Sequence, residues 1–308
     1  MTGGPGAVLV MGEALIDLVP SAQEARTHLA QPGGAPANVA AGLAGLGTPS
    51  WYAGALGGDG FARTIEERLV SAGAELGLCV RSPLPTALAV ADPGPEGTGY
   101  HFHLQDTATF RIQDRSSEVG RFGAVYVGGL AAVVEPAAEA VAATARAGAR
   151  ESVLVVDPNV REDRTLDPEA AAERLRELCA LAHVVKASDE DLVHLWPDTD
   201  PDETCRILAG EGRLVVLTRG ARGSTAYTRT GEPVSVPAVP VDVVNTIGAG
   251  DAFMAGVLSW LVGIGAHRSG GASTLPRERA EAMLRFASQV AASVVAQSGT
   301  EPSVLNRA

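Results

Sequence analysis

Cysteines and aromatic residues are both scarce in this chain of 308 residues. The three cysteines, Cys79, Cys179 and Cys205, are odd in number, widely spaced and without a metal-ligand pattern. We expect them to be buried free thiols in a reducing compartment rather than parts of a disulfide framework. Phe, Trp and Tyr make up 4% of the residues, which leaves little material for a pocket that stacks rings on a nucleobase.

An excess of positive charge is also missing. Lys and Arg number 24 against 36 Asp and Glu, so the net charge is −12, and no basic block interrupts the chain. Nucleic acid and anionic membranes are therefore not expected as partners. No apolar run reaches the roughly 20 residues that a transmembrane helix needs. Residues 1–19 have no basic region before their apolar run and no convincing cleavage site, so we expect a cytoplasmic protein without a signal peptide.

Two common ligand-binding motifs are absent as well. The chain contains no GxxxxGK[ST] phosphate loop, and no GxGxxG follows the first apolar run. These absences argue against a P-loop kinase and a standard dinucleotide-binding fold. The six histidines show no zinc-ligand spacing, and His101 and His103 share one face of a predicted strand, where surface or ligand contacts explain them better than a metal.

The chain does contain a regular alternation of short β-branched runs and longer alanine-rich segments of helical period. This pattern predicts a three-layer α/β/α core with a mainly parallel sheet covered by helices on both faces. The predicted strands are Ala7–Met11, Ser50–Ala53, Ala87–Ala91, Ala124–Val127, Val153–Val156, Val184–Lys186 and Leu214–Thr218. The predicted helices are Pro36–Leu46, Gly60–Ala72, Pro136–Ala147, Pro168–Ala182, Asp189–Trp196, Pro201–Ala209, Asp251–Val262 and Pro276–Ser298.

Two segments break the alternation. Leu15–Leu29 and Thr98–Leu104 are typical of exposed strands in a small sheet with one buried face. We interpret them as a β lid inserted into the main domain, and a pair of surface hairpins without a role is the alternative. The expected division is a core of residues 1–14, 32–96 and 107–308 and a lid of residues 15–31 and 97–106. Ligands of such sheets usually lie beyond the carboxyl ends of the strands.

The segment NTIGAGDAFMAGVL, residues 245–258, is the most informative part of the sequence. Three small residues lead into Asp251, and apolar residues then recur every four positions from Phe253 to Leu261, which predicts a helix with Asp251 in its first turn. Such a helix end presents unpaired N–H groups that attract phosphate. A carboxylate beside a phosphate site is explained if it serves the nucleophile of a phosphoryl transfer. The alternative is an ordinary helix N-terminus with a favourable acidic residue.

A second glycine-rich turn opens the helix near residue 36. Gly33 and Gly34 allow the backbone to approach a ligand closely, and Asn38 lies off the apolar stripe of the helix, where its amide is able to donate and accept hydrogen bonds. A capped helix after a plain Gly-Gly turn is an equally good interpretation. Asp17, six residues after the first strand, is a candidate for hydrogen bonds from adjacent hydroxyls, or else a solvated surface residue.

Three further segments place polar residues at predicted strand ends. Arg161 follows the strand of VLVVDPNVR, where it would contact a phosphate or close the turn with a salt bridge. Lys186 ends the next strand, and the acidic residues after it either stabilise a helix start or support Mg²⁺ through water. In LVVLTRGARGSTAY, Thr218 and the turn after it would hold a nucleotide, or form a simple hairpin.

The ordered set GEALID, GGAPANVA, GALGGDGFA, DPNVR, VKASDEDL, LTRGARGS and NTIGAGDAF resembles the ribokinase-like (PfkB) carbohydrate kinase family over essentially the whole chain. GGAPANVA and GAGDAFMAG resemble the two signatures of that family, and GE-x-LID with DPNVR is most similar to its fructokinase-like branch. The resemblance implies an α/β core with a β lid and ATP-dependent phosphorylation of a primary hydroxyl of a sugar.

The resemblance also implies roles for individual residues. The catalytic base would be Asp251, with the anion hole at Gly248, Ala249 and Gly250 and a nearby arginine at Arg161. The sugar would contact Asp17, Gly33, Gly34, Asn38, Phe102 and Asp251. The nucleotide would contact Lys186, Ser188, Thr218, Gly220, Gly223 and Gly250. Because Asp251 lies at a helix N-terminus, we expect it to keep a low pKa.

Two departures from the family pattern concern cations. The family usually has Asp at the position of Asn245 and often Thr or Ser at that of Ile247, where a monovalent cation binds, so we expect K⁺ dependence to be weak. The Asn-x-x-Glu magnesium motif of the family is here Ser188 to Asp191, so Asp191 and Glu190 would support Mg²⁺ through water.

The sequence thus predicts an ATP- and Mg²⁺-dependent sugar kinase, with fructose as the expected substrate. Three alternatives stay open at this stage: a 2-keto-3-deoxygluconate kinase, for which Arg161 is the obvious cation, a nucleoside kinase, and a catalytically silent sugar- or nucleotide-binding regulator. The protein partner that we expect is a second copy of the chain, bound through the lid.

Overall fold

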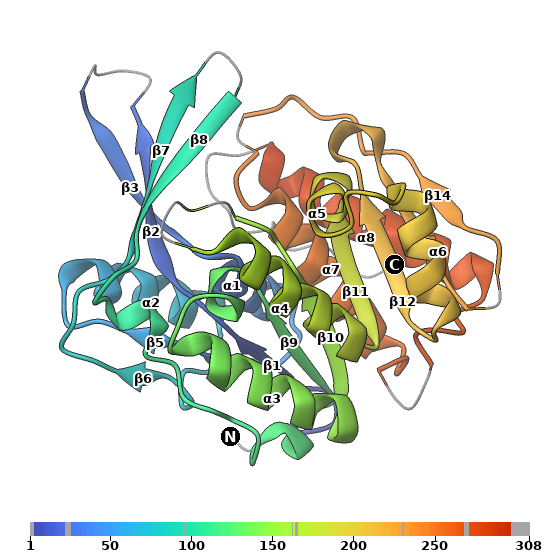
Figure 1. Ribbon diagram of the computed structural model, residues 1–308, viewed down its shortest axis with the longest axis horizontal. Coiled ribbons are helices and arrows are strands. Elements are labelled where there is room, and N and C mark those ends of the chain that lie inside the picture. Colours follow the sequence, from blue (N-terminus) through green and yellow to red (C-terminus); the bar gives the residue numbers. More distant parts are fainter. Residues whose placement is uncertain are drawn as a thin grey trace.

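A computed structural model describes residues 3–21, 26–94, 97–161, 163, 166–229, 231–244, 246–267 and 271–296. Its largest element is an eight-stranded sheet with the strand order β14-β13-β12-β11-β10-β9-β1-β4 (Figure 1). These strands are β1 (Val8–Met11), β4 (Ser50–Ala53), β9 (Ala124–Gly128), β10 (Val153–Asp157), β11 (Val184–Ser188), β12 (Leu214–Thr218), β13 (Ser224–Tyr227) and β14 (Val234–Val236). The strands from β4 to β12 in this order pair in parallel, and β13 and β14 add antiparallel at one edge.

Helices cover both faces of this sheet, which confirms the predicted three-layer architecture. The helices are α1 (Ala35–Gly45), α2 (Gly60–Ala72), α3 (Ala137–Glu151), α4 (Pro168–Leu181), α5 (Asp189–Leu195), α6 (Pro201–Gly210), α7 (Ala249–Gly263) and α8 (Arg277–Val295). Alternate residues of β1 enter opposite cores: Leu9 packs with residues of α3 to α6, and Val10 packs with residues of α1, α2, α7 and α8. Continuous apolar strands of this kind are buried on both faces.

A small sheet projects from one edge of the molecule, at the upper left of Figure 1. Its order is β3 (His28–Gly33), β2 (Leu15–Pro20), β7 (Leu88–Gly94) and β8 (Gly97–His103). Two short strands, β5 (Ala55–Leu56) and β6 (Val80–Arg81), form a third sheet.

The small sheet contains more of the chain than the sequence suggested. The predicted strand Ala87–Ala91 corresponds to β7, which pairs with β2 and β8 and not with the core sheet to which we assigned it. β3 likewise continues to Gly33, inside the range assigned to the core. The reason is that β7 begins with alternating Leu, Ala and Val residues, and such a pattern does not reveal which sheet a strand joins. That the small sheet closes over a ligand as a lid remains a prediction.

Most predicted elements match the structure within a few residues. Ser50–Ala53, Gly60–Ala72 and Leu214–Thr218 have the predicted bounds. The helix predicted to begin at Asp251 begins instead at Ala249, because Gly248 adopts the left-handed conformation (φ 77°) and serves as its N-cap. In the part of the chain that the structure describes, no helix is both long and apolar enough to span a membrane.

Candidate active site

The predicted site residues gather around one cavity of about 790 Å³. It lies where the small sheet meets the carboxyl ends of the parallel strands and the start of α7. The predicted residues that line it are Asp17, Gly34, Asn38, Phe102, Arg161, Lys186, Ser188, Glu190, Asp191, Thr218, Ile247, Gly248, Gly250 and Asp251. Asn245 lies outside the described residues.

Asp251 lies on the floor of this cavity, in the first turn of α7. The residue is 8% exposed, and its Oδ2 accepts a hydrogen bond of 2.7 Å from the Nδ2 of Asn38, which lies 213 residues earlier in the chain. This bond joins the two glycine-rich segments that the sequence singled out. With Oδ2 held by Asn38, Oδ1 is the second acceptor atom of this carboxylate.

The pKa of Asp251 corrects one expectation from the sequence. Burial raises this pKa above its ordinary value, although the hydrogen bond from Asn38 and the charges of Lys186, Arg161 and Arg68 lower it. The helix terminus alone favours a low value, but it does not offset the loss of hydration when the carboxylate is buried. A raised pKa makes Asp251 a better proton acceptor than a surface aspartate.

The start of α7 has the geometry of an anion site. The N-cap residue Gly248 makes no side-chain capping bond, and Gly248, Gly250 and Asp251 of this helix start line the cavity, so its first-turn N–H groups are candidates for the predicted anion hole. Ala249 donates its N–H to the carbonyl oxygen of Thr246, at 3.3 Å. The amides of Gly250 and Asp251 are therefore the better candidates for holding a phosphoryl group.

Asp17 and Gly33 are in direct contact at the wall formed by β2 and β3. A Cβ atom built on Gly33 would lie 2.1 Å from the Oδ2 of Asp17, so the carboxylate occupies the space that any other residue would need. Burial and the charge of Asp251 together raise the pKa of Asp17 to about 6, although the charges of Arg161 and Arg68 lower it. Gly33 is thus placed to set the position of Asp17 instead of lining the cavity itself.

Glu13 is a buried carboxyl group at the same cavity that the sequence did not assign to the site. Its carboxylate accepts hydrogen bonds from the N–H groups of Leu130 (3.2 Å) and Ala131 (3.0 Å), and burial raises its pKa to about 7. A Cβ atom on Gly34, whose φ is 96°, would lie 2.6 Å from the carbonyl oxygen of Glu13. Gly34 therefore permits the close approach between this segment and the start of α1.

Lys186 and Asp157 form a buried ion pair beneath the start of α7. The Nζ of Lys186 lies 2.9 Å from the Oδ2 of Asp157, and the two residues are 5% and 0% exposed. A Cβ atom on Gly250 would lie 3.4 Å from the same Nζ, which places this cation beside the candidate anion hole. Burial raises the pKa of Asp157 to about 6, whereas for Lys186 the neighbouring carboxylates outweigh burial and raise its pKa.

Both carboxylate oxygens of Asp191 accept hydrogen bonds from the protein. Its Oδ2 accepts hydrogen bonds from the N–H (2.8 Å) and hydroxyl (2.7 Å) of Ser188, which in turn caps α5, and its Oδ1 accepts one from the N–H of Val160 (2.8 Å). Val160 directly precedes Arg161, which lines the cavity. Asp191 therefore ties α5 to the loop that carries Arg161, a function that its spacing in the sequence did not indicate.

The turn after Thr218 forms a hairpin. Thr218 itself lines the cavity, but Gly220 and Gly223 lie in the connection between the antiparallel strands β12 and β13 and are not among the lining residues. A Cβ atom on Gly223 would lie 2.2 Å from the carbonyl oxygen of Val236, so packing against β14 accounts for this glycine. The hairpin alternative describes the local structure, and nucleotide contact by these two glycines remains a prediction.

Comparison with known proteins decides the family. Residues 6–307 match the family described as "pfkB family carbohydrate kinase". The chain belongs to the pfkB family. This membership confirms the resemblance inferred from the motifs and makes the protein a carbohydrate kinase, a phosphotransferase that acts on an alcohol group.

Relatives within the pfkB family include proteins named as fructokinases. A fructokinase of Klebsiella pneumoniae is 33% identical over 274 residues, which cover 85% of this chain and 85% of that protein. A crystal structure of a Vibrio cholerae O395 fructokinase with fructose, ADP and calcium ion bound superposes with a TM-score of 0.83 at 26% identity, covering 98% and 96% of the two chains. Aminoimidazole riboside kinase from Salmonella enterica, complexed with aminoimidazole riboside and an ATP analog, gives a TM-score of 0.78 at 25% identity, covering 96% and 95%.

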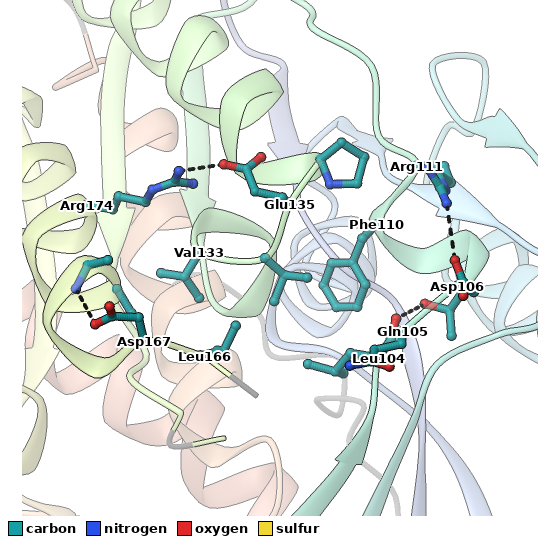
Figure 2. A pocket seen from close by; sticks show the side chains of 15 residues that line it. Leu104, Gln105, Asp106, Phe110, Arg111, Val133, Glu135, Leu166, Asp167 and Arg174 are labelled. Atoms are coloured by element: carbon teal, nitrogen blue, oxygen red, sulfur yellow. Dashed lines mark hydrogen bonds and ion pairs between the residues drawn. The ribbon is translucent and has the colours of Figure 1, made fainter. Parts of the chain in front are cut away.

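A second cavity of this kinase, of about 550 Å³, lies between the base of the small sheet and the starts of α3 and α4 (Figure 2). None of the predicted site residues lines it. Its two arginines are each paired with an acidic neighbour, Arg174 with Glu135 at 2.5 Å and Arg111 with Asp106 at 3.9 Å. Both arginines of this cavity therefore have acidic partners.

The contact between Gly33 and Asp17 leads to a first prediction for this pfkB kinase. Gly33→Ala is expected to raise KM for the sugar about 10-fold, because the new methyl group must displace the carboxylate and weaken a charge-assisted hydrogen bond. Steady-state kinetics with varied sugar at saturating ATP measure this effect, and KM for ATP should stay unchanged. Gly45→Ala in α1, where a Cβ atom meets nothing within 4 Å, is the matched control. An unchanged KM for the sugar in the Gly33 variant would remove Asp17 from the sugar site.

Proposed function

We propose that this carbohydrate kinase is a fructokinase that transfers the γ-phosphate of ATP to a primary hydroxyl of fructose. The single observation that carries the proposal is the hydrogen bond that Asn38 donates to the buried carboxylate of Asp251, in the first turn of α7. The two fructokinases compared above, 33% and 26% identical over most of this chain, support fructose as the substrate.

The proposed reaction begins with the sugar held between Asp17, Asn38 and Asp251. The primary hydroxyl lies at Oδ1 of Asp251 and attacks the γ-phosphorus in line with the leaving oxygen of ADP. Asp251 accepts the hydroxyl proton as the new P–O bond forms, and the amides of Gly250 and Asp251 hold the charge of the transferring group. Lys186 adds a fixed positive charge below these amides, because its Nζ lies next to Gly250.

Mg²⁺ is part of the proposal, as a cation carried by the nucleotide phosphates. Among the described residues, no group of three or more His, Cys, Asp or Glu side chains is placed to hold a metal ion directly. Glu190, which is exposed at the cavity, is the better candidate for a contact through water, since both oxygens of Asp191 accept hydrogen bonds from the protein. Bound Mg²⁺ would neutralise phosphate charge during transfer.

Weak dependence on K⁺ also remains a proposal. It rests on Asn245, which stands where the family usually has a carboxylate, and on the apolar Ile247, which lines the cavity. A cytoplasmic location and a homodimer formed through the small sheet are proposed on the sequence alone.

A nucleoside kinase is the second candidate, and one observation favours it. Tyr100 and Phe102 of β8 stack on each other, with ring centroids 6.0 Å apart, and both line the cavity. Such a pair is able to stack on a base, and the Salmonella enterica riboside kinase has the same fold. The fructokinase relatives outweigh this single contact.

A coupled assay of ADP release decides between these substrates. With ATP and Mg²⁺, fructose should give the highest kcat/KM in a set that includes ribose, 2-keto-3-deoxygluconate and adenosine, and replacing Na⁺ by K⁺ should change kcat less than about twofold. A preference for adenosine would indicate that Tyr100 and Phe102 stack on the nucleobase of the substrate. ADP release with none of the four would indicate a silent binding protein.

A further inference from the structure

We propose that Arg68, a residue of α2 outside the cavity lining, is a positioning residue that sets the catalytic carboxylate through Asn38. The proposal rests on the proposed role of Asp251. Arg68 is half-buried and comes from a helix that the sequence did not connect with the site. Its Nη1 donates a hydrogen bond of 2.8 Å to the Oδ1 of Asn38.

The three residues form a chain that starts on α2 and ends in the cavity. Arg68 donates to the amide oxygen of Asn38, and the amide nitrogen of Asn38 donates to the Oδ2 of Asp251 at 2.7 Å. A guanidinium group only donates hydrogen bonds, so it fixes the amide with the oxygen toward α2 and the nitrogen toward the cavity. This orientation keeps Oδ2 occupied and leaves Oδ1 of Asp251 for the sugar hydroxyl.

Arg68 makes a second contact that reaches the sugar side of the site. Its Nη1 also donates to the carbonyl oxygen of Pro32, at 3.1 Å. Pro32 directly precedes Gly33, which abuts the carboxylate of Asp17. One side chain therefore holds both the end of β3 beside Asp17 and the amide of Asn38 that donates to Asp251. The contact with Pro32 should act on KM for the sugar, and the contact with Asn38 on kcat.

The positive charge of Arg68 also favours the ionised form of the site carboxylates. It lowers the pKa of both Asp251 and Asp17, whose burial raises it. The other charged groups that face Asp251 are Glu13 after β1, Asp17 in β2, Asp157 at the end of β10, Arg161 in the following loop and Lys186 in β11. Without Arg68, this set loses one of its three cations, and the carboxylates take up a proton at higher pH.

The test measures kcat, KM and the pH profile of Arg68→Met in the intact enzyme. We expect kcat to fall about 10-fold, the lower range for a hydrogen bond to a charged group. The acid limb of the kcat profile should move to higher pH, and KM for fructose should rise. Arg68→Lys should recover part of the acid limb, because it restores the charge without the guanidinium fork. Arg63→Met, an exposed arginine of the same helix, is the control and should behave as the wild type.

A double-mutant cycle separates positioning from a loss of structure. If Arg68 acts on kcat through Asn38, then Arg68→Met should change kcat less than about twofold in an Asn38→Ala background, while the rise in KM for fructose persists there. An equal loss of kcat in both backgrounds, or an unmoved acid limb in the single variant, would overturn the proposal. If the wild-type enzyme releases no ADP with any sugar, the proposed function is refuted and the double-mutant cycle gives no kinetic result. The melting temperatures of the variants then show whether Arg68 is only a structural residue; we expect them to lie within a few degrees of each other.

Discussion

Asp251→Asn should lower kcat for fructose phosphorylation at least about 100-fold, the lower range for loss of a general base. The amide has the shape of the carboxylate and its oxygen still accepts the hydrogen bond from Asn38, but it does not accept the hydroxyl proton. Stability should be unchanged or higher, since burial opposes ionisation of Asp251. KM for ATP should stay near the wild-type value, because the amides that hold the phosphate are kept.

The matched control for this substitution is Asp106→Asn, at an aspartate whose side chain is 93% exposed. It removes the same charge far from the cavity floor and should leave kcat unchanged. A kcat within threefold of wild type in the Asp251 variant would contradict the assignment of the base, whatever its effect on KM.

Lys186→Met should destabilise the protein by about 3–5 kcal/mol, the usual result of removing one partner of a buried ion pair. The substitution leaves Asp157 buried and without its cation, and the Oδ1 of that carboxylate already has no hydrogen-bond partner among the described residues. Urea unfolding followed by circular dichroism measures the change. The loss of the cation beside Gly250 should also lower kcat.

The pH dependence of this destabilisation has a definite sign. Burial raises the pKa of Asp157 even with Lys186 present, to about 6, so without the lysine the carboxyl group takes up a proton more readily. A carboxyl group with a raised pKa in the folded state loses stability as pH rises. The Lys186 variant should therefore lose more stability at about pH 8 than at about pH 5. An equal loss at both values would show that removing Lys186 leaves the pKa of Asp157 unchanged.

The double variant Asp157→Asn with Lys186→Met separates folding from catalysis. It removes both charges, so it should recover most of the lost stability. It does not restore the cation at the anion hole, so kcat should stay low. Recovery of kcat together with stability would show that Lys186 has only a structural role.

The alternation of strands and helices was sufficient to predict the core. Apolar strands buried on both faces and helices that begin at prolines left clear patterns, and the structure has them within a few residues. The small sheet was harder to predict, because the sequences of its strands contain little that indicates which strands pair with each other. β7 resembles a core strand in sequence, and its pairing with β2 depends on contacts across 72 residues.

The gathering of candidate residues around one cavity was predictable where chemistry requires a rare residue pattern. Asp251 and Asn38 follow glycine-rich turns at helix starts, and the structure joins them directly. The burial of a side chain, and the residues that hold it from behind, left no such pattern in the sequence. The raised pKa of Asp251 depends on the layers that enclose it, and Arg68 looks in the sequence like any arginine of a charged helix face.

The most direct test of the central claim is to identify the product that the wild-type enzyme forms from ATP and fructose. Proton-coupled ³¹P NMR of the reaction mixture distinguishes the position of the new phosphate. We predict ADP and a fructose monophosphate in equal amounts, with a phosphorus signal split by two methylene protons, as a phosphorylated primary hydroxyl requires. Release of ADP with inorganic phosphate alone, or a phosphorus signal split by one proton, would contradict the account.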